Sequence, residues 1–166
     1  MRCFPALFAG FLVAAAPAFA MDMPPRKPGL WELKMEFDSR NLPPRTMKQC
    51  IDAATDKIMN ANFGGAAQEA CSRREISKAG DTIVVDSVCK FGAALSTSHA
   101  VVSGRFDSDY MVDITSTRAG TATHMKIAAK WLGPCAAGQR PGDVIMSNGM
   151  TMNMLDVQKG APPKRP

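Results

Sequence analysis

The sequence lacks the signatures of several protein classes. No apolar run reaches the roughly 18 residues that a membrane-spanning helix needs, so a single-span membrane protein is excluded. There is no C-x-x-C pair, no G-x-S-x-G elbow and no phosphate-binding glycine loop. Histidine is scarce, since only His99 and His124 occur, and neither has another good metal ligand at a recognised spacing. We therefore predict no catalytic constellation and no cofactor.

The overall composition is that of a globular chain. Apolar residues make up 46% and charged residues 21% of the 166 residues, which argues against disorder. The formal net charge is +5, but the basic residues are scattered and no aromatic residues are interleaved with them. Nucleic-acid binding is therefore not expected.

The N-terminus has the parts of a secretory signal peptide. Arg2 is followed by an apolar stretch over residues 4–16 and then by Ala18-Phe19-Ala20, an A-x-A cleavage pattern. We expect cleavage after Ala20 and a periplasmic location. Residues 21–28 are Pro-rich and polar, which predicts a flexible arm.

Hydrophobic alternation predicts strands along most of the mature chain. In residues 29–37, Trp31, Leu33, Met35 and Phe37 point one way and charged residues the other, as in a half-buried strand. Further strands are expected over 45–51, 71–77, 82–89, 97–106, 110–117 and 121–132, and one helix over 52–62. The predicted fold class is all-β: a bent antiparallel meander of about seven strands, a barrel or half-barrel, with one short helix.

The domain organisation follows from these elements and from a change in composition. The β-rich domain covers residues 29–135, a Met-rich segment covers 136–157, and a basic, Pro-rich tail over 158–166 is expected to be disordered.

Four cysteines remain after the leader, and an even number in an exported chain predicts disulfides. If Gly80 centres a three-residue turn, opposed residues have numbers that sum to 160, which places Cys71 opposite Cys89. Cys50 and Cys135 are then left for each other.

Several segments resemble one family. They are Gly29-Leu30-Trp31-Glu32, Gln49-Cys50-Ile51 before a short helix, the Cys71…Cys89 hairpin and Trp131-Leu132-Gly133-Pro134-Cys135. In this order they resemble the small exported bacterial proteins with a G-L-W-E motif, domain of unknown function 3617. The resemblance covers about residues 28–135 and implies an exported, envelope-located, β-rich domain. It supplies no activity that could be transferred.

Two binding hypotheses follow from the residues themselves. The leading one is an envelope protein without a catalytic site that binds an apolar or amphipathic ligand, such as a lipid, in a pocket lined by Trp31, Met125 and Trp131. The alternative is copper(I) handling, because thioethers are soft ligands that select Cu(I). Against copper, methionine is also a common filler of apolar gaps. The methionines concerned are Met146, Met150, Met152 and Met154.

Overall fold

The computed structural model describes residues 21–38, 42–61 and 70–160, and the expected signal peptide lies outside them. Its strands are β1 (Gly29–Phe37), β2 (Arg45–Ile51), β3 (Cys71–Ala79), β4 (Thr82–Phe91), β5 (Ala94–Arg105), β6 (Asp109–Arg118), β7 (Thr121–Gly133), β8 (Asp143–Met146) and β9 (Thr151–Asn153). The helices are α1 (Ala53–Ala61) and α2 (Met154–Gln158). None of the described helices is long and apolar enough to cross a membrane.

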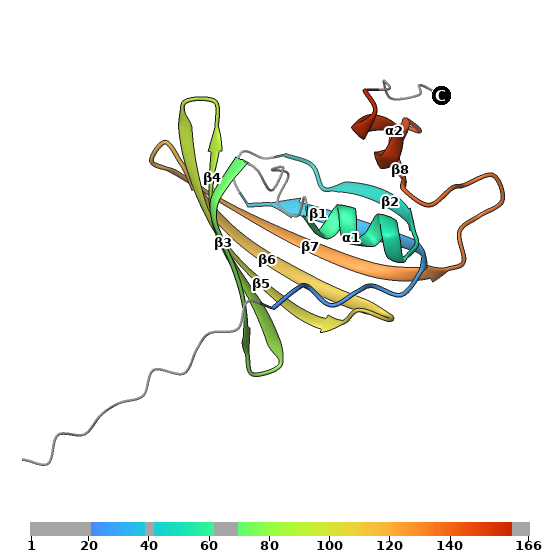
Figure 1. The fold of residues 1–166 in the computed structure, drawn as a ribbon, viewed down its shortest axis with the longest axis horizontal. Coiled ribbons are helices and arrows are strands. Elements are labelled where there is room, and N and C mark those ends of the chain that lie inside the picture. Colours follow the sequence, from blue (N-terminus) through green and yellow to red (C-terminus); the bar gives the residue numbers. More distant parts are fainter. Residues whose placement is uncertain (1–20, 39–41, 62–69, 161–166) are drawn as a thin grey trace, which may run out of the picture.

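The strands of the described part of the chain form one antiparallel sheet in the order β3-β4-β5-β6-β7-β1-β2-β8-β9. The meander β3 to β7 is extended when β1 pairs with β7, and the order then continues through β2 to the C-terminal strands. The sheet is strongly curved and open, and α1 lies across its concave face (Figure 1). The all-β prediction is confirmed, with a half-barrel in place of a closed barrel. The prediction of about seven strands did not include β8 and β9, because these lie in the Met-rich segment, where no strand was expected.

The core lies on the concave face, and alternation decides which side chains reach it. Trp31, Leu33, Met35 and Phe37 of β1 stand opposite Trp131, Ala129, Ile127 and Met125 of β7, so both apolar sets share one side of the sheet. The buried cluster comprises Trp31, Leu33, Ile51, Ile83, Val85, Ala100, Val102, Tyr110, Val112, Ile114, Ile127 and Ala129.

The Gly-Leu-Trp-Glu motif opens β1 where strands approach closely. Gly29 has φ +132°, and a Cβ there would lie 2.3 Å from the carbonyl oxygen of Gly133 on β7, so a larger residue would clash. Trp31 points into the core and is fully buried. Glu32 points to the other face, where it is paired in register with Lys48 and Lys130.

Disulfides join Cys71 to Cys89 and Cys50 to Cys135. Both predicted pairings are confirmed, but the turn used to derive the first one was wrong. Ala79 pairs with Thr82, so the turn has two central residues and the register is shifted by one. An irregularity between Cys71 and Arg73 shifts it back and places Cys71 opposite Cys89.

Helix α1 begins one residue later than predicted, at Ala53, and it buries a polar side. The predicted last residue, position 62, lies outside the described residues. Asp52 caps it, because the Thr55 amide donates to Asp52 Oδ1 at 2.8 Å and the Asp52 amide donates to Thr55 Oγ1 at 2.9 Å. The amide and the hydroxyl of Thr55 both donate to the Asp52 carboxylate, and these two bonds lower its pKa. Ala54 of the helix is exposed, whereas Thr55 and Asp56 are buried. A carboxylate of the helix therefore faces the sheet.

Candidate ligand-binding site

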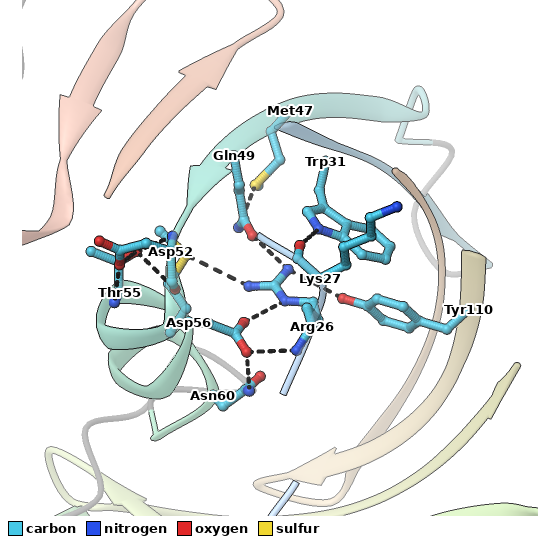
Figure 2. A network of polar contacts seen from close by, with 11 residues as sticks. Arg26, Lys27, Trp31, Met47, Gln49, Asp52, Thr55, Asp56, Asn60 and Tyr110 are labelled. Atoms are coloured by element: carbon cyan, nitrogen blue, oxygen red, sulfur yellow. Dashed lines mark hydrogen bonds and ion pairs between the residues drawn. The ribbon is translucent and has the colours of Figure 1, made fainter. Parts of the chain in front are cut away.

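A buried arginine occupies the centre of the concave face. Arg26 belongs to the segment expected to be a flexible arm, but this segment packs on the domain: Arg26 is 5% exposed, and the Lys27 amide donates to Phe106 O at 2.8 Å. The Arg26 side chain points at α1, where Nε donates to Asp56 Oδ1 at 2.6 Å and the backbone amide donates to Asp56 Oδ2 at 2.8 Å (Figure 2). Arg26 and Asp56 thus form a two-bond ion pair between arm and helix.

The remaining guanidinium donors reach the sheet. Nη1 of Arg26 donates to Gln49 Oε1 at 2.9 Å and to Tyr110 Oη at 3.3 Å. The guanidinium carbon lies 5.9 Å from the centre of the Trp31 ring, whose Nε1 donates to Lys27 O at 2.8 Å. Figure 2 shows the curved strands surrounding this network. The middle of the concave face is therefore filled by the protein's own side chains.

Burial also affects Tyr110, which stacks on Phe106 with 5.1 Å between ring centres. Loss of solvent raises the pKa of the Tyr110 phenol, although the charge of Arg26 opposes that shift. Tyr110 is consequently a neutral phenol that accepts a hydrogen bond from Arg26.

An open space adjoins this network. A cavity of about 590 Å³ lies between the arm, α1 and β3, within the range of small-molecule sites. Its apolar lining comes from Met21, Met23, Pro25, Ala53 and Ile76, and its polar lining from Asp22, Asp56, Lys57, Asn60 and Arg74. We call this space the amphipathic cleft.

Arg74 is a half-buried cation in the lining of the cleft. It lies on β3, directly opposite Ser87 of β4, and its Nη2 donates to the carbonyl oxygen of Asn60 near the end of α1 at 2.7 Å. Partial burial lowers the pKa of its guanidinium. The arginine at the preceding position, Arg73, points to the other face and forms a 2.7 Å ion pair with Glu75.

The three residues predicted to line one pocket are spread along the sheet, and none of them is among the described lining residues of the amphipathic cleft. Trp31 and Trp131 are paired in register, but Arg26 covers the fully buried Trp31, and Lys27 Nζ lies 3.6 Å from the centre of the Trp131 ring. Met125 is paired with Phe37, six residues along β7 from Trp131, or about 20 Å at 3.3 Å per residue. The alternation of apolar residues along β1 and β7 identified the concave face correctly, but it did not indicate that Arg26 and Lys27 lie over the two tryptophans of that face.

Of the four methionines of the C-terminal segment, three lie in or beside the strands β8 and β9, and the fourth lies in α2. Met146 ends β8, and its amide donates to Met150 O at 2.9 Å, while Met152 on β9 is paired with Val144. Met154 leaves this pattern because it begins α2. A further methionine, Met47 of β2, is paired with Met146, which the sequence analysis did not anticipate.

On the convex face, His124 is held by two carboxylates. Its Nδ1 lies 2.5 Å from Asp38 Oδ2 and its Nε2 lies 2.6 Å from Asp113 Oδ1. Hydrogen bonds to Asp113 and Asp38 raise the pKa of the imidazole. Both ring nitrogens are thus engaged, and the described residues contain no group of three His, Cys, Asp or Glu side chains that could hold a metal ion.

Arg26 and Asp56 were missed by the sequence analysis. Asp56 lies four residues after Asp52, the residue that caps the helix, and it reads as an ordinary acidic residue in a first turn. Arg26 is flanked by Pro25 and Lys27 in a segment that reads as a linker. Each position carries a charge that sequence alone assigns to solvent, and only the pairing of the two allows burial.

Taken together, the described residues form a curved antiparallel sheet that holds one helix and an amphipathic cleft on its concave side. Residues 26–135, more than half of the chain, match the family model described as a protein of unknown function, DUF3617. The chain therefore belongs to the DUF3617 family, and the suspected resemblance is confirmed. Searches of curated proteins and of solved structures each gave no match.

Proposed function

We propose that this protein is exported to the periplasm, where it binds an amphipathic ligand with an anionic head group in the amphipathic cleft. The observation that carries the proposal is the mixed lining of a cavity of about 590 Å³ beside a concave core that is already filled.

The shape and lining of the cleft favour a ligand with two chemically different ends. Met21, Met23, Pro25 and Ile76 offer apolar surface, and methionine adapts to chains of variable shape. Ala53, Lys57 and Asn60 come from α1, on the other wall. An alkyl chain could lie against the arm and β3 while its head group contacts the helix.

The charges of the cleft favour an anionic head. Lys57 and Arg74 are cations, whereas the Asp56 carboxylate is already neutralised by Arg26 at 2.6 Å. Among the described lining residues, Asp22 is the other acidic side chain, and it is exposed. Arg74 is suited to phosphate or carboxylate because its planar guanidinium presents several donors.

Support for export comes from the leader and from the disulfides. Residues 1–20 have the charged start, apolar stretch and A-x-A end of a signal peptide. All four cysteines of the remaining chain are joined in pairs, which fits an oxidising compartment such as the periplasm.

Binding of dodecyl phosphate below its micellar concentration tests the cleft. We expect isothermal titration calorimetry to detect binding to the wild type, and Arg74→Gln to weaken it about tenfold, since a hydrogen bond to a charged group is worth about 1.5 to 3 kcal/mol. Arg73→Gln is the matched control, because Arg73 lies on the same strand but faces away and pairs with Glu75. It should leave the affinity within twofold.

A neutral amphiphile with the same chain, dodecyl maltoside, separates the head group from the tail. We expect the wild type to bind dodecyl maltoside more weakly than dodecyl phosphate. The affinity for dodecyl maltoside should be the same in Arg74→Gln as in the wild type. Absence of binding by the wild type, or equal losses in Arg73→Gln and Arg74→Gln, would contradict the proposed site.

A further inference from the structure

Methionines from β2, from β8 and from the segment that leads into β9 lie close together at the β9 edge of the sheet. Met47 of β2 is directly paired with Met146 of β8, and the Met146 amide donates to Met150 O at 2.9 Å as the chain returns toward β9. Met152 of β9 is paired with Val144, which lies two residues before Met146 and therefore on the same side of β8. We call these four residues the methionine row.

The spacing of the row suits a shared ligand. Directly opposed residues of antiparallel strands have Cβ atoms about 4.5 to 5.5 Å apart. Methionine has three rotatable side-chain bonds, so neighbouring sulfur atoms can converge on one point between the strands. All four side chains are half-buried, neither sealed in the core nor fully exposed. An ion could therefore reach the sulfur atoms from solvent.

The chemistry of the row selects a soft ion. Thioether sulfur prefers Cu(I) among the biological metals. Cysteine sulfur does not compete for the ion, because the four described cysteines are in disulfides, and both nitrogens of His124 contact carboxylates. Gln49 Nε2 lies 3.7 Å from Met47 Sδ, and Figure 2 shows this sulfur turned toward Gln49 on the concave side of the sheet.

We infer that Met47, Met146 and Met150 form a Cu(I)-binding site, with Met152 as a fourth sulfur ligand. This assignment differs from the sequence hypothesis in two ways. It adds Met47, which lies about a hundred residues away in the chain but beside Met146 in the sheet. It also removes Met154, which begins α2 and leaves the strand alternation. The site is separate from the amphipathic cleft and does not depend on it.

Anaerobic competition with a chromogenic Cu(I) chelator, using the oxidised full-length mature chain, tests this assignment. We expect Met47→Leu and Met146→Leu each to weaken Cu(I) binding at least tenfold. Leucine is the chosen replacement because it conserves volume and packing. Two controls should stay within twofold of the wild type: Met154→Leu, from the same segment, and Met111→Leu, an exposed methionine on β6.

A second measurement keeps the test decisive if a variant folds poorly. Ag(I) is a redox-stable substitute for Cu(I), and we expect it to shift the methyl NMR signals of Met47, Met146, Met150 and Met152 in the wild type while those of Met111 and Met154 stay in place. Unchanged affinity in Met47→Leu, an equal loss in Met154→Leu, or methyl shifts spread over all methionines would overturn the site. Dodecyl phosphate binding should be the same in Met47→Leu as in the wild type, so failure of one proposal is distinguishable from failure of the other.

Discussion

Replacing Asp56 by alanine should lower the free energy of unfolding by about 3 to 5 kcal/mol, because it leaves the Arg26 guanidinium buried without its counter-charge. The side chains of Arg26 and Asp56 are 4% and 1% exposed, so solvent does not replace the lost partner. The loss would also free the arm from α1, since both the backbone amide and Nε of Arg26 bond to this carboxylate. Urea unfolding followed by circular dichroism measures the change.

An exposed arginine–aspartate pair in the same chain provides the control. Arg105 and Asp107 are 2.9 Å apart, but their side chains are 74% and 57% exposed. Asp107→Ala should therefore leave the free energy of unfolding nearly unchanged. The double variant Arg26→Met/Asp56→Leu should recover much of the stability lost in Asp56→Ala, since it removes both buried charges together. Equal effects of Asp56→Ala and Asp107→Ala would show that the buried pair does not hold the arm.

Removing the disulfide between Cys50 and Cys135 is expected to have the second large effect, about 4.5 kcal/mol in the chain-entropy model. Its cysteines are 85 positions apart, against 18 for Cys71 and Cys89, whose removal should cost about 3 kcal/mol in the same model. The longer bridge spans the end of β1, which lies between β7 and β2 in the sheet. It also lies next to the C-terminal segment, because the Gly142 amide donates to Cys50 O at 2.8 Å.

Paired cysteine-to-alanine variants, Cys50→Ala/Cys135→Ala and Cys71→Ala/Cys89→Ala, separate the two bridges. Denaturant unfolding of both should place the long-loop variant below the short-loop variant in stability. The reverse order would mean that native packing, rather than loop length, determines what each bridge contributes.

Much of the fold could be predicted because buried and exposed side chains alternate along a half-buried strand, and this gives the sequence a period of two. The expected strand over residues 29–37 has the bounds of β1, and 45–51 those of β2. The strands β8 and β9, of four and three residues, were not among the predicted strands, although Met150, Met152 and Met154 alternate with polar residues as in a half-buried strand. In the hairpin between β3 and β4, a turn error and an unforeseen irregularity cancelled, so the cysteine pairing was correct although its derivation was not.

The candidate site was harder to predict, for a different physical reason. Alternation assigns Trp31 to the inner face, but it carries no information about Arg26, which reaches that face from a segment without a period. Met47 and Met146 meet through the pairing of β2 with β8, a long-range register that local patterns do not encode. Contacts between distant segments therefore determine the site, while local patterns determine the strands that support it.

Native mass spectrometry of the protein recovered from a periplasmic extract tests the proposed function most directly. We expect the mass of residues 21–166 with two disulfides, together with a second species carrying one bound amphipathic molecule with an acidic head group. In Arg74→Gln the bound species should decline strongly, and in Arg73→Gln it should persist. A protein that retains residues 1–20, or that carries no adduct in either the wild type or Arg73→Gln, would contradict the assignment of the cleft as a ligand site in an exported protein.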